Sequence, residues 1–127
     1  MKIAALISRF LLGLVFFVFG LNGFLHFIPT PPLPPTTAGR FAGALLESHF
    51  VFVVSGVQLV CGVLLLVNRY VPLALTLLGP VIVNIFFYHL LMDRIGLPTA
   101  TVVVILWVIL FVRHRQYFSG LFVQKAG

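Results

Sequence analysis

An uncharged apolar stretch in the second half of the chain decides the fold. Residues 71–92 read VPLALTLLGPVIVNIFFYHLLM and contain no Asp, Glu, Lys or Arg. About 20 such residues, wound as a helix, cross the roughly 30 Å hydrocarbon core of a bilayer. Because irregular backbone cannot face lipid, this stretch is predicted to be a membrane-spanning helix.

Three further apolar stretches flank this segment, at residues 10–28, 49–67 and 98–112. Pro72 and Pro98 each stand near the start of a stretch, where the first helical turn tolerates proline. No small-residue cleavage site precedes the proline run, so we expect the first stretch to be kept as a span. The sequence therefore predicts an all-α integral membrane protein, a single domain over residues 1–127 built as a four-transmembrane-helix bundle.

The connection between the first two spans has its own composition. Residues 29–36 are rich in proline, which removes backbone donors and favours an extended loop. Thr37 is then a plausible N-cap for a short helix over residues 38–47, with Phe41 and Leu45 at helical spacing. We expect an interfacial helix on the outer face of the membrane.

Composition excludes the soluble classes. Of the 127 residues, 61% are hydrophobic and only 8% are charged, whereas ordinary globular domains carry about 25% charged residues. The net charge of +6 would suggest nucleic acid only if the cations clustered on a water-facing surface. Here the Lys and Arg residues stand mainly between and at the ends of the apolar stretches. The expected partner is therefore the lipid bilayer and not nucleic acid.

Charge also predicts the orientation of the spans. With the amino terminus inside, the cytoplasmic side holds Lys2, Arg9, Arg69, Arg113, Arg115 and Lys125, and the outer side holds Arg40 and Arg94. Lys and Arg accumulate on the cytoplasmic side of membrane proteins. Both termini are therefore expected in the cytoplasm.

The polar side chains within and next to the first three spans form two layers at different depths. The inner layer is Asn22, Gln58 and Asn84, and the outer layer is His26, His49, His89, Glu47 and Asp93. If the three helices turn these faces inward, they form a polar cleft that opens outward, with Glu47 and His49 at its mouth. The inner amides then either bond between helices or hold a polar group of a bound molecule.

The histidines and the single cysteine give little indication of metal or thiol chemistry. His26, His49 and His89 lie on different helices with no metal-ligand spacing, so they are only weak candidates and no metal site is predicted. Cys61 is the single cysteine, which excludes an intramolecular disulfide and a CxxC motif. It is expected to be a buried packing residue. Small residues on the first two spans, Gly13, Gly20, Gly23, Ser55, Gly56 and Gly62, predict close helix contacts.

Three segments resemble the DoxX family of small four-helix bacterial membrane proteins. They are GLNGF at residues 20–24, GVQLVCGVLLL at 56–66 followed by Arg69, and PVIVNIFFYH at 80–89 followed by Asp93. The resemblance implies a bundle in the bacterial inner membrane and a link to redox chemistry. Some relatives are thiosulfate:quinone oxidoreductase subunits or partners of thiol and superoxide defence enzymes. Relatives often have a carboxylate where this chain has Gln58, so an acid-dependent proton step is not implied.

Three functions follow from these observations. The first is a non-catalytic partner or accessory subunit that docks a membrane or periplasmic protein through the proline run, Phe41 and Leu45. The second is a quinone-binding oxidoreductase subunit. Its inner amides would hold the head group, and His26 or His89 would carry protons. The third is a small-solute or proton transporter, disfavoured because the chain has little room and no inverted repeat.

Overall fold

The computed structural model describes residues 1–29 and 32–127, and every regular element in them is helical. The α-helices are α1 (Lys2–Leu25), α2 (Thr37–Glu47), α3 (Val51–Val67), α4 (Val71–Leu91) and α5 (Leu97–Arg113), and short 3-10 helices cover Arg94–Gly96, Arg115–Tyr117 and Ser119–Phe122. The predicted all-α fold class is confirmed. Of the predicted proline-rich loop, Thr30 and Pro31 lie outside the described residues.

Three helical segments are long and apolar enough to cross a membrane: Lys2–Leu25, Val71–Leu91 and Arg94–Arg113. The pair α2 and α3 passes the same test only together, and the two helices are bent by 85° at the break between them. The described chain therefore has three candidate spans, or up to four if the bent pair is one broken span.

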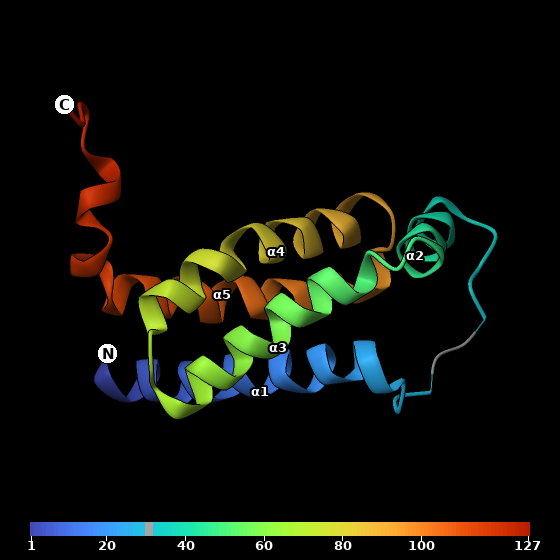
Figure 1. Ribbon diagram of the computed structural model, residues 1–127, viewed down its shortest axis with the longest axis horizontal. Coiled ribbons are helices and arrows are strands. Elements are labelled where there is room, and N and C mark those ends of the chain that lie inside the picture. Colours follow the sequence, from blue (N-terminus) through green and yellow to red (C-terminus); the bar gives the residue numbers. More distant parts are fainter. Residues whose placement is uncertain (30–31) are drawn as a thin grey trace.

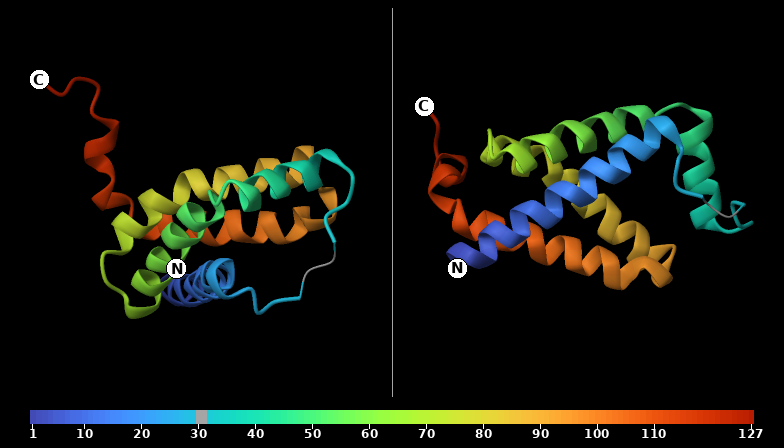
Figure 2. Two further views of the ribbon diagram at one scale, coloured as in Figure 1. Left: turned by 45° about the vertical axis from the view of Figure 1, so that its right-hand side comes forward. Right: turned by 90° about the horizontal axis from the view of Figure 1, so that it is seen from below.

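The four long helices pack in chain order. Helix α1 packs against α3 and α5, and α4 packs against the same two helices, which places α1 diagonally from α4 (Figure 2). The chain runs up and down the bundle, so the amino terminus, the α3–α4 turn and the end of α5 meet at one end (Figure 1). We call this the basic end, after Lys2, Arg69 and Arg113. The opposite end, where α2 lies across the bundle, is the α2 end.

The core is concentrated toward the basic end. The largest fully buried side chains are Leu12, Phe16, Cys61, Leu65, Leu75, Leu78 and Leu110. All of them except Phe16, which lies just past the middle of α1, come from the half of the helix nearer the basic end. Cys61 is fully buried, as its apolar surroundings in the sequence predict. The half toward the α2 end is more open, and it is this half that contains most of the polar residues singled out above.

Glycine brings α1 and α3 into backbone contact. A Cβ atom at Gly20 would lie 2.5 Å from the Leu59 nitrogen, and one at Gly62 would lie 2.5 Å from the Phe17 nitrogen. At Gly23 an added Cβ would collide with the Ser55 side chain. The prediction that small residues permit close helix contacts is confirmed for this pair.

Two helix starts differ from the sequence expectation. Helix α2 is capped by Thr36 rather than Thr37, because the Thr36 hydroxyl accepts the Gly39 N–H at 3.2 Å. Helix α1 begins at Lys2 rather than near Phe10, since Arg9 does not end it. Nη1 of Arg9 donates to the carbonyls of Leu65 and Leu66 at the end of α3, and these bonds accommodate the charge inside the helix.

Candidate functional site

The polar residues of α1 are engaged in the turn that leaves the helix. His26 is the C-cap in the left-handed conformation, with φ 52°, and its N–H donates to the Asn22 carbonyl at 2.8 Å. The Asn22 side-chain oxygen accepts the N–H of Ile28 at 2.8 Å. Asn22 therefore stabilises the helix end through both its backbone and its side chain. The His26 ring is exposed.

Asn84 lies on the outer surface of α4. Its side chain is exposed between Val83, which is 54% exposed, and the half-buried Ile85, and Nδ2 donates to the Pro80 carbonyl at 2.8 Å. Gln58 is half-buried on α3. Asn84 thus satisfies a donor on its own helix, on a surface that faces away from the core. The expected inner layer is not drawn together by hydrogen bonds among the described residues.

His89 and Asp93 build the turn between α4 and α5. Nδ1 of His89 is 3.1 Å from the Asp93 carbonyl oxygen, and the Asp93 carboxylate accepts the Ile95 N–H at 3.3 Å. The His89 ring lies directly against Gly96, where a side chain would have no space. These two predicted residues are close together, and their shared role is to hold this turn.

Tyr88 links α4 to α2, a role that the sequence analysis missed. Its hydroxyl donates to the Ala38 carbonyl at 3.4 Å, and its ring centroid is 5.5 Å from that of Phe41. A tyrosine near the end of an apolar helix is the available signal, because its apolar ring and polar hydroxyl suit a boundary between two environments. Tyr88 therefore connects α2 to the end of α4.

The predicted docking residues occupy one side of α2. Phe41 is 43% exposed although it contacts Tyr88, and Leu45 is half-buried. Next to Phe41 on the helix, Thr37, Arg40 and Glu47 form an exposed polar side, and Arg40 donates to the Thr37 hydroxyl at 3.1 Å. Helix α2 is therefore amphipathic, with its apolar side toward the bundle.

His49 takes part in a column of stacked rings. Its backbone has φ 64°, and its ring is stacked on Phe52 with centroids 5.9 Å apart. Phe52 is stacked on Phe24 of α1 at 5.5 Å. The predicted outer mouth thus contains an aromatic link between α1 and α3. Glu47, the last residue of α2, is exposed. Within residues 1–29 and 32–127, no three His, Cys, Asp or Glu residues are grouped so that they could hold a metal ion.

A hollow of about 270 Å³ lies along the outer side of α4 and α5. It is lined by Gly79, Ile82, Val83, Phe86 and Phe87 from α4 and by Val104, Trp107 and Val108 from α5. The indole N–H of Trp107 donates to the Leu75 carbonyl at 2.9 Å, so the tryptophan is fixed between the two helices. We call this hollow the apolar groove. The sequence analysis missed it, because the groove depends on how the two helices are rotated.

No family model, curated protein or solved structure matches this chain. The predicted polar residues that form hydrogen bonds do so mainly within their own helices and turns. Two of the surfaces described above, the side of α2 that contains Phe41 and the apolar groove, are accessible.

Proposed function

We propose that the chain is a multi-pass membrane protein in which α1, α3, α4 and α5 cross the bilayer and α2 lies on its outer surface. The 85° bend between α2 and α3 supports an in-plane α2. At 1.5 Å per residue, the 17 residues of α3 extend about 25 Å, close to the hydrocarbon thickness. The exposed Thr37, Arg40 and Glu47 would then face water, the buried Ala38 and Gly39 would face the protein, and the partly exposed Phe41 would lie at the edge between the two sides.

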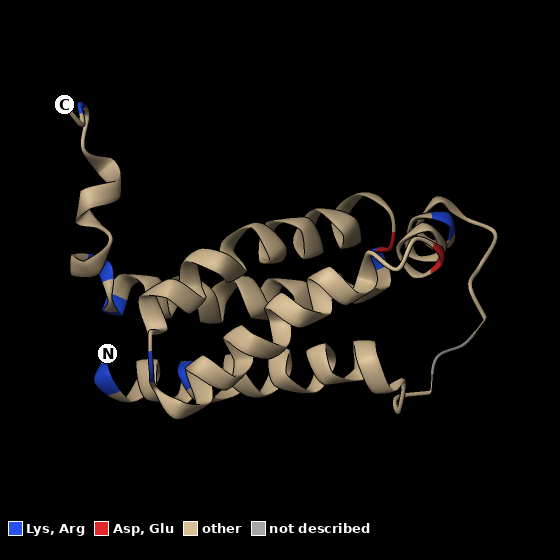
Figure 3. Cartoon of the chain, in the orientation of Figure 1, with Lys and Arg blue, Asp and Glu red and all other residues tan. Residues whose placement is uncertain are grey.

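The distribution of charge supports an orientation with both termini in the cytoplasm of a bacterium. Figure 3 shows most Lys and Arg residues toward the basic end and its carboxyl-terminal extension. The remaining two, Arg40 and Arg94, lie at the α2 end with both acidic residues, Glu47 and Asp93. Cytoplasmic loops of membrane proteins carry the excess of Lys and Arg. The basic end would accordingly be cytoplasmic and the α2 end periplasmic.

Within this frame the proposed function is that of a non-catalytic, DoxX-like accessory subunit of a membrane redox system. One observation carries it: Tyr88 connects α2 to the end of α4, and Phe41 of α2 remains partly exposed. Meanwhile Asn22, His89 and Asp93, which a reaction would need, stabilise helix ends and turns. The DoxX resemblance of residues 20–24, 56–66 and 80–89 supplies the redox context of this proposal.

The test is capture of the partner from native membranes by the tagged full chain after chemical crosslinking. Joint replacement of Phe41 and Leu45 by Ser should abolish the crosslinked complex. Ala44→Ser, on the exposed polar side of α2, is the matched control and should retain it. Asn84→Leu should also retain it. A complex that survives the double replacement would refute docking through α2.

The apolar groove favours a second candidate function, binding of a quinone. Aromatic side chains commonly enclose a flat ring, and Phe86, Phe87 and Trp107 line this groove. Asn84 is exposed on the same helix, next to the lining residue Val83. Its side-chain oxygen could accept a hydrogen bond from a reduced head group.

Quinone binding is tested by equilibrium dialysis of the detergent-solubilised protein against a short-chain ubiquinone analogue. If the groove binds quinone, Val83→Trp should fill it and lower the bound fraction several-fold, and Asn84→Leu should weaken binding less. Val53→Trp, at an exposed position on α3, is the control. Binding that is equal in all variants would exclude the groove.

A further inference from the structure

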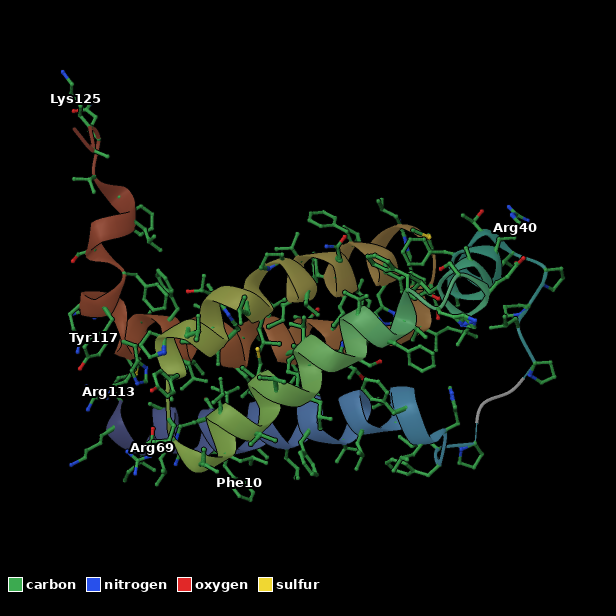
Figure 4. All side chains as sticks on the ribbon, in the orientation of Figure 1. Phe10, Arg40, Arg69, Arg113, Tyr117 and Lys125 are labelled. Carbon is green, nitrogen blue, oxygen red and sulfur yellow. The ribbon has the colours of Figure 1, made fainter. Side chains whose placement is uncertain are left out.

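A second hollow, of about 420 Å³, lies at the basic end. Its walls come from the first turns of α1, from Asn68 in the α3–α4 turn, and from the end of α5 with the 3-10 turn that follows. In Figure 4, Arg113 and Tyr117 stand at this end, near the amino terminus of α1. We call this hollow the basic pocket.

The basic pocket collects positive charge without any neutralising side chain. Lys2, Arg9 and Arg113 line it. The only acidic side chains of the chain are Glu47 and Asp93, which are both at the α2 end. Three cations around one hollow repel one another, more strongly where the surroundings are apolar. A bound anion would relieve this repulsion.

Two of the lining residues are held in place by backbone carbonyls. Arg9 bonds to Leu65 and Leu66 through Nη1, so among the described residues the donors on Nε and Nη2 remain for another acceptor. The His114 ring is held by Nδ1, which is 2.9 Å from the Leu110 carbonyl oxygen. Because both side chains are already ordered, binding an anion here requires little further loss of conformational entropy.

The neutral lining residues suit a phosphate group. Asn68, Gln116 and Tyr117 add amide and hydroxyl donors to those of the three cations. A phosphate carries several acceptor oxygens and forms charge-assisted hydrogen bonds with Arg and Lys. The pocket therefore offers more donors than a single carboxylate could use.

Apolar side chains continue from the basic pocket along the outer surface of α1. Ile3 and Leu6 line the pocket and are 74% and 56% exposed. Phe10, one turn further, is 54% exposed and projects from the outer side of the helix in Figure 4. A soluble phosphate would make no contact with these exposed apolar side chains, whereas the acyl chain of a lipid would cover them.

We infer that the basic pocket binds the phosphate group of an anionic phospholipid. The headgroup occupies the space among Lys2, Arg9 and Arg113, and an acyl chain follows Ile3, Leu6 and Phe10 along α1. The site differs from a diffuse basic surface because its donors come from three separate parts of the chain and converge on one hollow.

The experiment is native mass spectrometry of the delipidated full chain in detergent, titrated with phosphatidylglycerol or phosphatidylcholine. We expect phosphatidylglycerol to bind preferentially. Replacing Lys2 and Arg113 together by Gln should weaken its binding roughly tenfold or more. Arg9 is left unchanged, because its bonds to α3 make it important for the fold.

The control is the double replacement Arg69→Gln with Lys125→Gln, which removes the same charge from residues outside the pocket lining. It should change affinity by less than about twofold. Equal weakening in both double variants would overturn a built site, and so would equal binding of the two lipids. Displacement of phosphatidylglycerol by excess inorganic phosphate would overturn the assignment to a lipid. Circular dichroism verifies that all variants remain helical.

Discussion

Helices α1 and α3 touch through their backbones, whereas α4 and α5 touch through large side chains. Gly20 and Gly62 leave no space for even one methyl group between the first pair. The second pair is bridged by Trp107 and keeps the apolar groove on its outer side. Both pairs are similarly apolar in composition, so residue size, and not hydrophobicity, decides how closely two of these helices approach.

The largest expected effect is that of Gly20→Ala. The new Cβ would lie 2.5 Å from the Leu59 nitrogen and 2.9 Å from the Ser55 carbonyl oxygen. Backbone atoms cannot rotate away as a side chain can, so the two helices must separate. We expect the free energy of unfolding to fall by about 2–3 kcal/mol. The measurement is loss of helical circular dichroism in mixed micelles of increasing dodecyl sulfate content.

Arg9→Gln tests the end of the same helix contact. It removes the charged donor from the Leu65 and Leu66 carbonyls, which are left at the open end of α3. The same titration should show a loss of about 1.5 kcal/mol. Lys2→Gln, with the same change of charge on the same helix, should remain within about 0.5 kcal/mol of the unmodified chain. If the two variants are equally stable, the Arg9 bonds contribute nothing to the contact.

Trp107→Phe tests the side-chain bridge between α4 and α5. It preserves an aromatic ring and removes the hydrogen bond to the Leu75 carbonyl. Hydrogen bonds between membrane helices contribute about 0.6 kcal/mol on average, and the smaller ring leaves some unfilled volume, so we expect a loss of about 1 kcal/mol. A loss as large as that of Gly20→Ala would contradict the distinction between the two helix pairs.

The smallest effect, and one of opposite sign, is expected for Gly79→Ala. A Cβ at Gly79 has Trp107 at 3.8 Å as its nearest neighbour, which is ordinary van der Waals contact. Alanine in place of glycine favours a helix by about 0.5–1 kcal/mol, so the variant should be slightly more stable. Since Gly20→Ala is the same chemical change, the pair isolates packing from helix propensity. Destabilisation by Gly79→Ala would contradict the free space beside Gly79.

The helices were predictable because bilayer-length apolar runs leave the chain few alternatives. Residues 71–92 gave α4 to within one residue, and Gly20 and Ser55 were identified by their size. The start of α1 was missed by several residues, because a hydropathy pattern penalises Arg9. Burying Arg9 inside the helix becomes favourable only because its guanidinium donates to a carbonyl at the end of α3, and the sequence does not show this contact.

The site residues were less predictable, because depth along a helix is a property of sequence but rotation about its axis is not. Asn22 and Asn84 can be ranked by depth from the rise per residue. That Asn84 faces outward follows from the packing of α4 on α3 and α5. The basic pocket was out of reach for the same reason: Lys2 and Tyr117 are far apart in sequence, and only the turn after Arg113 brings them together.

Trp107 also has a spectroscopic consequence. It is the only tryptophan in the chain, it lines the apolar groove, and its ring is stacked on Phe111 at 5.2 Å. Intrinsic fluorescence therefore reports on this one location without a label. Brominated acyl chains in contact with the groove should quench the emission, and a ligand that occupies the groove should protect it. Trp107 fluorescence is thus an intrinsic probe of what occupies the apolar groove.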